Sequence, residues 1–153
     1  APSTAQVHLF RGVAPGTPLP AMSDRRLNVP GLVANDRFGQ SMVVTGDVDG
    51  DQTPDVVIGA PGAFIAPSTM GNNVRAGGVF VFLQGGAMQL RAGSGEQADQ
   101  QFGAGLGRVG DWNGDGRAEW IVGSPGLDIG AAQNVGLVQV WGMNGQMPAL
   151  RAT

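Results

Sequence analysis

The sequence predicts an all-β fold made of repeated four-stranded antiparallel units, and three observations support this prediction. Glycine accounts for 27 of the 153 residues and proline for 10, whereas glycine usually makes up only about 7% of a chain. This composition is typical of short strands joined by tight turns. Motifs also recur along the chain at a constant spacing. No segment keeps apolar residues at a helical spacing over more than two turns, so no long helix is expected.

The size and composition are those of a single domain. A chain of 153 residues with 42% hydrophobic residues can bury a substantial core and is not of the disordered class. It contains no cysteine, which excludes a disulfide framework and a thiolate metal site. No apolar run approaches the ~18 residues of a membrane-spanning helix, so no membrane span is expected.

The negative charge is concentrated in two short loops. The chain has 12 acidic residues and 9 basic residues, all of them arginine, for a formal net charge of −3, which two bound divalent cations would change to +1. Local acidity of this kind is the reverse of a nucleic-acid-binding surface, so no nucleic-acid partner is expected. Seven of the acidic residues lie in the two loops: Asp47, Asp49, Asp51, Asp55, Asp111, Asp115 and Glu119.

The repeated motifs define two complete units of four strands each. Phe38-Gly39, Asp47 and Gly59-Ala-Pro61 recur 64 residues later as Phe102-Gly103, Asp111 and Gly123-Ser-Pro125. The four strands are expected at residues 40–45, 55–58, 79–83 and 88–91, and again at 104–109, 119–122, 137–141 and 149–152. The glycine-led third strands, 78–82 and 136–140, align at an offset of 58, because the preceding loop is six residues shorter in the second unit.

The N-terminal residues read as the outer half of a third unit. Residues 7–10 align with the third strand of the next unit, and residues 26–29 are a plausible fourth strand. Ala1-Pro-Ser-Thr4 repeats Ala66-Pro-Ser-Thr69, which lies in a loop between strands two and three. We therefore expect a single domain divided into a half unit at 1–35 and full units at 36–92 and 93–153.

Both acidic loops have the oxygen-rich pattern of a calcium site. Acidic or amide residues at alternate positions let a tight loop turn several oxygens inward, and calcium takes six to eight oxygen ligands. A cation would also remove the repulsion between the clustered carboxylates. The candidate ligands are the side chains of Asp47, Asp49, Asp51 and Asp55 with the Thr53 carbonyl, and those of Asp111, Asn113, Asp115 and Glu119 with the Arg117 carbonyl.

Two other interpretations of these loops are less favoured. An EF-hand needs a glutamate at position 12 and flanking helices, but Ile58 and Val122 stand there and strands are expected on both sides. The loops could also be polar turns without a metal, because Asp and Gly are common turn residues. The recurrence of the pattern in the same strand context favours the metal.

Taken together, these motifs resemble the FG-GAP repeat, the unit of the integrin α-subunit β-propeller. Phe38-Gly39 and Phe102-Gly103 match the FG, and the segments ending at Pro61 and Pro125 match the GAP, with serine for alanine in the second. The resemblance implies β-propeller blades with calcium in the loops. Two departures stand out: Glu119 occupies a position where the family usually has Asp, and Gln52 one where Gly is common.

A propeller closes from about four to eight blades, so this chain would form only part of one. We expect the remaining blades to come from a longer precursor, a complementary chain or self-association, because isolated blades leave open strand edges. A stable, well-folded monomer of 15.6 kDa without a partner would contradict this expectation.

The functional expectation is a non-enzymatic, extracellular or secreted adhesion or protein-interaction module. No catalytic motif is present, and the only histidine, His8, has no acid or nucleophile placed beside it by the sequence. Trp120 is expected in the core, whereas Trp112 is a candidate for stacking on a sugar or a protein partner. The alternatives are a carbohydrate-binding propeller (a lectin) and an accessory propeller part of a larger secreted enzyme.

Overall fold

The computed structural model describes residues 4–10, 12–18, 20, 22, 24–65, 74–83, 89–94, 97–145 and 147–153. Over these residues the chain is nearly all β, as predicted, and a single 3-10 turn, η1 (Ala34–Asp36), interrupts the strands. Ala1-Pro-Ser3, the whole repeat at 66–69 and the first residue of the strand predicted at 88–91 lie outside the described residues.

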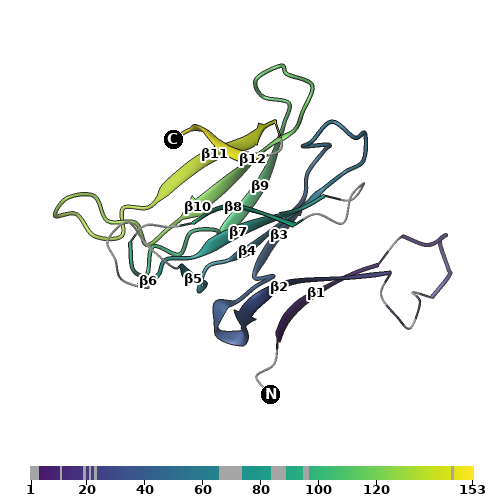
Figure 1. The fold of residues 1–153 in the computed structure, drawn as a ribbon, viewed down its shortest axis with the longest axis horizontal. Coiled ribbons are helices and arrows are strands. Elements are labelled where there is room, and N and C mark those ends of the chain that lie inside the picture. Colours follow the sequence, from purple (N-terminus) through teal and green to yellow (C-terminus); the bar gives the residue numbers. More distant parts are fainter. Residues whose placement is uncertain are drawn as a thin grey trace.

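Two four-stranded antiparallel sheets form the body of the molecule (Figure 1). In both sheets the strands lie side by side in chain order, as in a meander. The first consists of β3 (Ser41–Val44), β4 (Val56–Ala60), β7 (Gly78–Phe82) and β8 (Gln89–Ser94). The second consists of β9 (Gly105–Gly110), β10 (Glu119–Ser124), β11 (Leu137–Asn144) and β12 (Met147–Ala152). These are the eight strands expected from the repeats, displaced at their ends by a few residues.

The N-terminal segment forms a hairpin of β1 (Thr4–Leu9) and β2 (Arg25–Val33), which matches the two outer strands predicted there. A second small hairpin, β5 (Phe64–Ile65) with β6 (Val74–Arg75), lies in the long connection between β4 and β7 and was not predicted. In Figure 1 the β1–β2 hairpin lies on one side of the first sheet and the second sheet lies on the other.

The observed strand pairing corrects the alignment of the third strands by one residue. Gly59 pairs with Val79 in the first sheet, and its repeat Gly123 pairs with Val138 in the second. The structural offset between β7 and β11 is therefore 59, not 58. This difference matters because a shift of one residue in a strand moves every side chain to the other face of the sheet.

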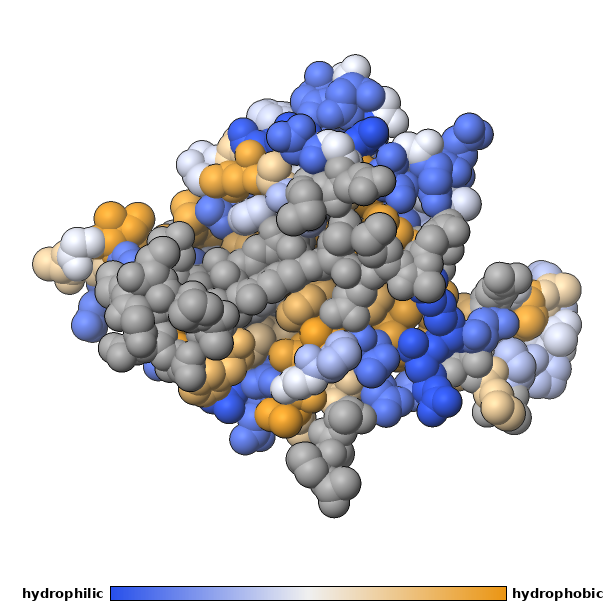
Figure 2. All heavy atoms as spheres, viewed as in Figure 1, coloured by the Kyte–Doolittle hydropathy of each residue, from blue (hydrophilic) through white to orange (hydrophobic). Residues whose placement is uncertain are grey.

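Two hydrophobic clusters hold the sheets together, one on each face of the first sheet. Val57, Val79 and Val81 pack toward Trp120 and Val122 of the second sheet. The alternate residues of the same strands pack against the β1–β2 hairpin; they include Val56, Ile58, Phe80 and Phe82, which meet Leu27 and Phe38. Burial on both faces of the sheet explains why β4, the second strand of the first sheet, is a continuous apolar run. Hydrophilic residues gather over the loops at one end of the molecule (Figure 2).

Candidate functional site

The two acidic loops lie at the same end of the molecule, where the first strand of each sheet turns into the second (Figure 1). In the first loop the carboxylate of Asp47 organises the backbone. Its Oδ1 accepts hydrogen bonds from the backbone N–H groups of Asp49 (3.2 Å), Gly50 (2.6 Å) and Asp51 (3.1 Å), and its Oδ2 accepts one from Gln52 (2.7 Å). The loop therefore wraps around one carboxylate.

The second loop repeats this arrangement around Asp111. Its Oδ1 accepts from the N–H groups of Gly114 (2.8 Å) and Asp115 (3.0 Å), and its Oδ2 from Gly116 (2.9 Å). Gln52, the residue equivalent to Gly116, has a left-handed φ of 68° and makes the same bond to its own central carboxylate. The missing glycine in the first loop thus leaves the loop geometry unchanged, although a side chain in this conformation costs energy.

Three carboxylates converge in the first loop. One oxygen from each of Asp47, Asp49 and Asp55 lies within 4.8 Å of the other two. Asp55 is fully buried and its Oδ2 accepts a hydrogen bond from the backbone of Val48 at 3.0 Å. Asp51 lies outside this triad, where its Oδ1 accepts from the backbone and hydroxyl groups of Thr53. The triad is thus an acidic cluster that offers a cation one oxygen from each of three carboxylates.

The protonation behaviour of the triad reflects its crowding. Burial raises the pKa of Asp49, and the neighbouring carboxylates of Asp51 and Asp47 raise it further, against a backbone hydrogen bond that lowers it. Burial also acts to raise the pKa of Asp47, but the four backbone donors outweigh it and the pKa of that group is lowered. A cation placed among these oxygens would favour the charged form of each.

In the second loop an amide, Asn113, stands where the first loop has the carboxylate of Asp49. Asn113 Oδ1 accepts from the N–H of Asp115 at 2.8 Å. Its Nδ2 donates to Asp115 Oδ2 (3.0 Å) and to Glu119 Oε1 (3.1 Å). The amide nitrogen therefore links two carboxylates of the predicted ligand set. The backbone N–H of Arg117 donates to the other oxygen of Asp115 at 3.0 Å.

The longer arm of Glu119 is accommodated by a glycine on the neighbouring strand. Glu119 is fully buried, and its Oε2 accepts a hydrogen bond from Trp112 N–H at 2.8 Å, as Asp55 does from Val48. A Cβ added at Gly142 would lie 2.8 Å from Glu119 Oε1. The equivalent residue of the first sheet is Leu83, which is buried. The pair Asp55–Leu83 is thus replaced by the pair Glu119–Gly142, a relationship that sequence spacing alone did not reveal.

The other residues singled out in the sequence lie as follows. Trp120 is fully buried, as predicted, and Trp112 is 58% exposed. His8 is exposed on β1. Among the described residues, no helix is long and apolar enough to cross a membrane.

Comparison with known proteins supports the interpretation of the repeats. Residues 38–82 match the FG-GAP repeat family. The chain is 35% identical to integrin alpha-PS2 of Drosophila melanogaster over 104 residues, covering 64% of this chain and 7% of the relative. It is 36% identical to integrin alpha-E of Mus musculus over 102 residues, covering 62% of this chain and 8% of the relative. The chain therefore spans less than a tenth of either relative. On these grounds the chain contains an FG-GAP repeat, a unit that forms β-propeller blades, and is similar in sequence to part of the integrin α-subunits.

Proposed function

We propose that this chain is a calcium-binding segment of a β-propeller that acts as an extracellular adhesion or protein-interaction module. The observation that carries the calcium part is the convergence of Asp47, Asp49 and Asp55, whose oxygens lie within 4.8 Å of one another. The adhesive and extracellular part is supported by the similarity to integrin α-subunits.

In this proposal the first loop binds calcium through its acidic side chains and the Thr53 carbonyl. The chemistry of the set fits, because carboxylate and carbonyl oxygens are the ligands that calcium prefers. Bound calcium would supply positive charge that offsets the repulsion among the carboxylates. The ion would thereby brace the turn between β3 and β4 rather than take part in a reaction.

The second loop is proposed to bind calcium more weakly. It offers Asp111, Asn113, Asp115, Glu119 and the Arg117 carbonyl, one carboxylate fewer than the first loop. In addition, the Asn113 nitrogen donates hydrogen bonds to two of these carboxylates. Those hydrogen bonds would have to be given up before an ion could be coordinated, which lowers the net gain from binding.

We further propose that the chain has no catalytic role and works as part of a larger propeller. Asp47 and Asp111, the central carboxylates of the two loops, are held by backbone donors, and the only histidine lies on the surface of β1. The sheets of this chain supply fewer strands than a closed ring of four-stranded blades needs. Further blades from the same or another chain would complete it.

Calcium titration with a chelator control tests the central claim. The melting temperature is measured in calcium and in EDTA, and bound calcium is counted by elemental analysis. The proposal predicts a higher melting temperature in calcium. An unmoved transition together with a calcium-free protein would show that the loops are structural turns only.

Alanine substitutions at equivalent positions assign the sites. Asp49→Ala should remove the tighter site, whereas Asn113→Ala should affect only the weaker one. Calorimetric titration of the two variants distinguishes these outcomes. Loss of both sites in either variant would contradict two separate loops.

A further inference from the structure

The first sheet receives a Phe-Gly segment from the second unit, and this contact is made through the backbone of that segment. The N–H of Phe102 donates a 2.8 Å hydrogen bond to the carbonyl of Ala76. The Ser41 hydroxyl donates a 2.6 Å bond to the carbonyl of Gly103. A Cβ added at Gly59 would lie 2.2 Å from that same carbonyl oxygen and 2.2 Å from Ser41 Oγ on the neighbouring strand. Glycine is therefore required at position 59, because both the incoming backbone and the hydroxyl that binds it lie directly on it.

The other Phe-Gly pair of the chain is seated in a related way against the N-terminal hairpin. A Cβ added at Gly39 would lie 2.7 Å from Val7 Cγ2, and one added at Gly103 would lie 2.7 Å from Val79 Cγ2. Val7 lies on β1, the strand equivalent to β7 of the first sheet. Both Phe-Gly pairs in the chain are thus already packed on the preceding unit.

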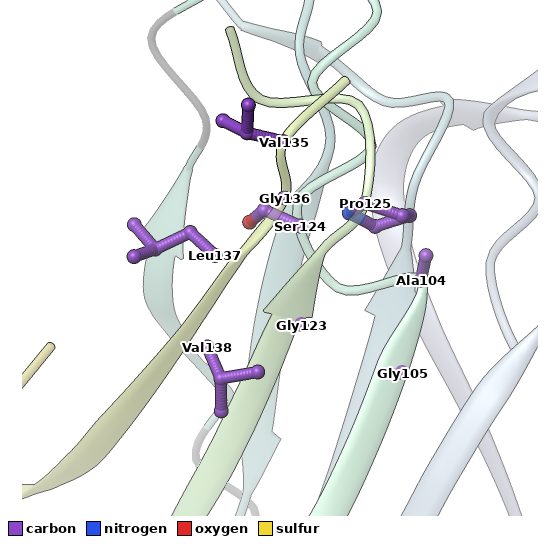
Figure 3. Close-up of a pocket in the computed structure, with 9 residues that line it drawn as sticks. All are labelled: Ala104, Gly105, Gly123, Ser124, Pro125, Val135, Gly136, Leu137 and Val138. Atoms are coloured by element: carbon purple, nitrogen blue, oxygen red, sulfur yellow. The ribbon is translucent and has the colours of Figure 1, made fainter. Parts of the chain in front are cut away.

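The second sheet has the same receiving surface, but it is open. It forms a groove of about 580 Å³ that includes Gly105, Gly123, Val135, Gly136, Leu137 and Val138 (Figure 3). By strand pairing, Gly105 is equivalent to Ser41, Gly123 to Gly59, and Val138 to Val79. Val79 is completely buried beneath Gly103, whereas Val138 is 58% exposed.

The groove belongs to a sheet face that is covered in the first unit. Val57, Val79 and Val81 of the first sheet are all fully buried against the second sheet. Their equivalents Ile121, Val138 and Val140 are only partly buried or exposed. The second sheet therefore presents the same apolar face and groove as the first, without the unit that packs there.

We propose that this groove, hereafter the open socket, binds the Phe-Gly segment of a further FG-GAP unit. The inference rests on the proposed propeller function and specifies the contact by which the propeller continues. The occupant must come from another unit, because Phe38-Gly39 and Phe102-Gly103 are both engaged. The backbone N–H of its phenylalanine is expected to donate a hydrogen bond to the carbonyl of Val135, the equivalent of Ala76. Its glycine lies over Gly123, without the hydroxyl bond that Ser41 provides in the first sheet.

An extended chain tests the socket directly. A second copy of residues 94–153 is fused after Thr153, so that an additional Phe-Gly pair follows the second sheet at the spacing seen in the chain. Because the protein has no cysteine, Val138→Cys supplies a single thiol in the socket. We expect the extension to slow modification of this thiol about tenfold or more, since reaction then requires the docked unit to open.

The control is a variant that adds one methyl group to the floor of the open socket. Gly123→Ala is tolerated in the free sheet, where the nearest atom to the new Cβ is 3.7 Å away. It would meet the docked carbonyl as an alanine at Gly59 would. In the extended chain this substitution should restore rapid modification of Cys at position 138.

A second probe does not depend on folding of the added copy. A synthetic peptide of residues 97–104 at millimolar concentration should slow thiol modification in the unextended chain, and a peptide carrying Gly103→Val should not. Unchanged modification in both the extended chain and the peptide experiment would overturn the socket. Both are run in calcium and in EDTA, so that a failure of calcium binding is seen separately from a failure of docking.

Discussion

The backbone N–H of Ala118 donates a 2.7 Å hydrogen bond to the carbonyl oxygen of Asp47. Ala118 is buried at the end of the second acidic loop, and Asp47 is the residue around which the first loop is wrapped. The base of the first loop is closed by bonds from Thr45 N–H to the Asp55 carbonyl (2.9 Å) and from Asp55 N–H to the Gly46 carbonyl (3.2 Å). The predicted metal site of one unit is therefore joined to the neighbouring unit.

This joint predicts that calcium in the first loop slows hydrogen exchange at the Ala118 amide. An ion that holds Asp47 in place also holds the acceptor of that amide, so opening becomes rarer. Exchange is measured residue by residue by NMR in calcium and in EDTA, with Asp49→Ala as the control that removes the effect. Slower exchange at Gly50 and Asp51 without any change at Ala118 would show that the ion does not brace the junction.

Exchanging Asp and Asn between positions 49 and 113, the third residues of the two loops, should reverse how stability with and without calcium differs between the loops. In EDTA, Asp49→Asn should stabilise the protein by about 0.2–1 kcal/mol, the range for partly exposed charge pairs, because it removes a carboxylate that is partly buried and is crowded by Asp51 and Asp47. In calcium the same variant should gain less from the ion than the parent does. Asn113→Asp should have the opposite pair of effects, and urea unfolding in both buffers measures them.

The pH dependence of the Asp49→Asn effect follows from the raised pKa of Asp49. A carboxyl group whose pKa is raised by folding lowers stability once it ionises, so its cost appears as the pH rises through that pKa. In EDTA the stabilisation by Asp49→Asn should therefore be larger at pH 7 than below 3.8, the ordinary value for the group. A gain that is equal at both pH values would mean that charge is not its cause.

Glu119 and Gly142 should behave as a coupled pair. Gly142→Ala places a Cβ 2.8 Å from Glu119 Oε1 and is expected to destabilise the protein by about 1–3 kcal/mol, as overpacking usually does. In a Glu119→Asp background the shorter arm relieves the contacts with Glu119 and leaves the one with Arg151 Nε, 3.0 Å from the added Cβ, so the same substitution should cost less. A double-mutant cycle from urea unfolding gives the coupling. Additive effects would indicate that the two residues do not share the space.

The glycines of the two Gly-Ala-Pro and Gly-Ser-Pro motifs should differ in their tolerance of alanine. Gly59→Ala meets the Gly103 carbonyl and the Ser41 hydroxyl that binds it, both at 2.2 Å, and should cost about 1–3 kcal/mol or more. Gly123→Ala finds its nearest neighbour at 3.7 Å and should change stability by no more than about 0.5 kcal/mol. Thermal unfolding of both variants makes the comparison. Equal losses would mean that the groove at Gly123 is not open in solution.

The sequence predicted the strands and loops because their signals are local. A buried strand such as β4 is a continuous apolar run, and a loop such as the one around Asp47 is marked by acidic residues at alternate positions. The two registers of the third strand could not be separated in this way. The pair Gly77-Gly78 offers two alignments with Gly136, and the backbone selects Gly77, since Gly77 and Gly136 both have positive φ, at 92° and 72°.

The sequence alone predicts the all-β repeat, the order of its strands and the position of its acidic loops. The tertiary fold is needed to bring distant residues together: Ala118 with Asp47 and Gly103 over Gly59 between units, and Gly142 beside Glu119 within the second sheet. The difference arises because strand and turn preferences act between residues close in the chain. Contacts between units depend instead on strand register, which changes with the length of the connecting loops. A shift of one residue moves each side chain to the other face of the sheet.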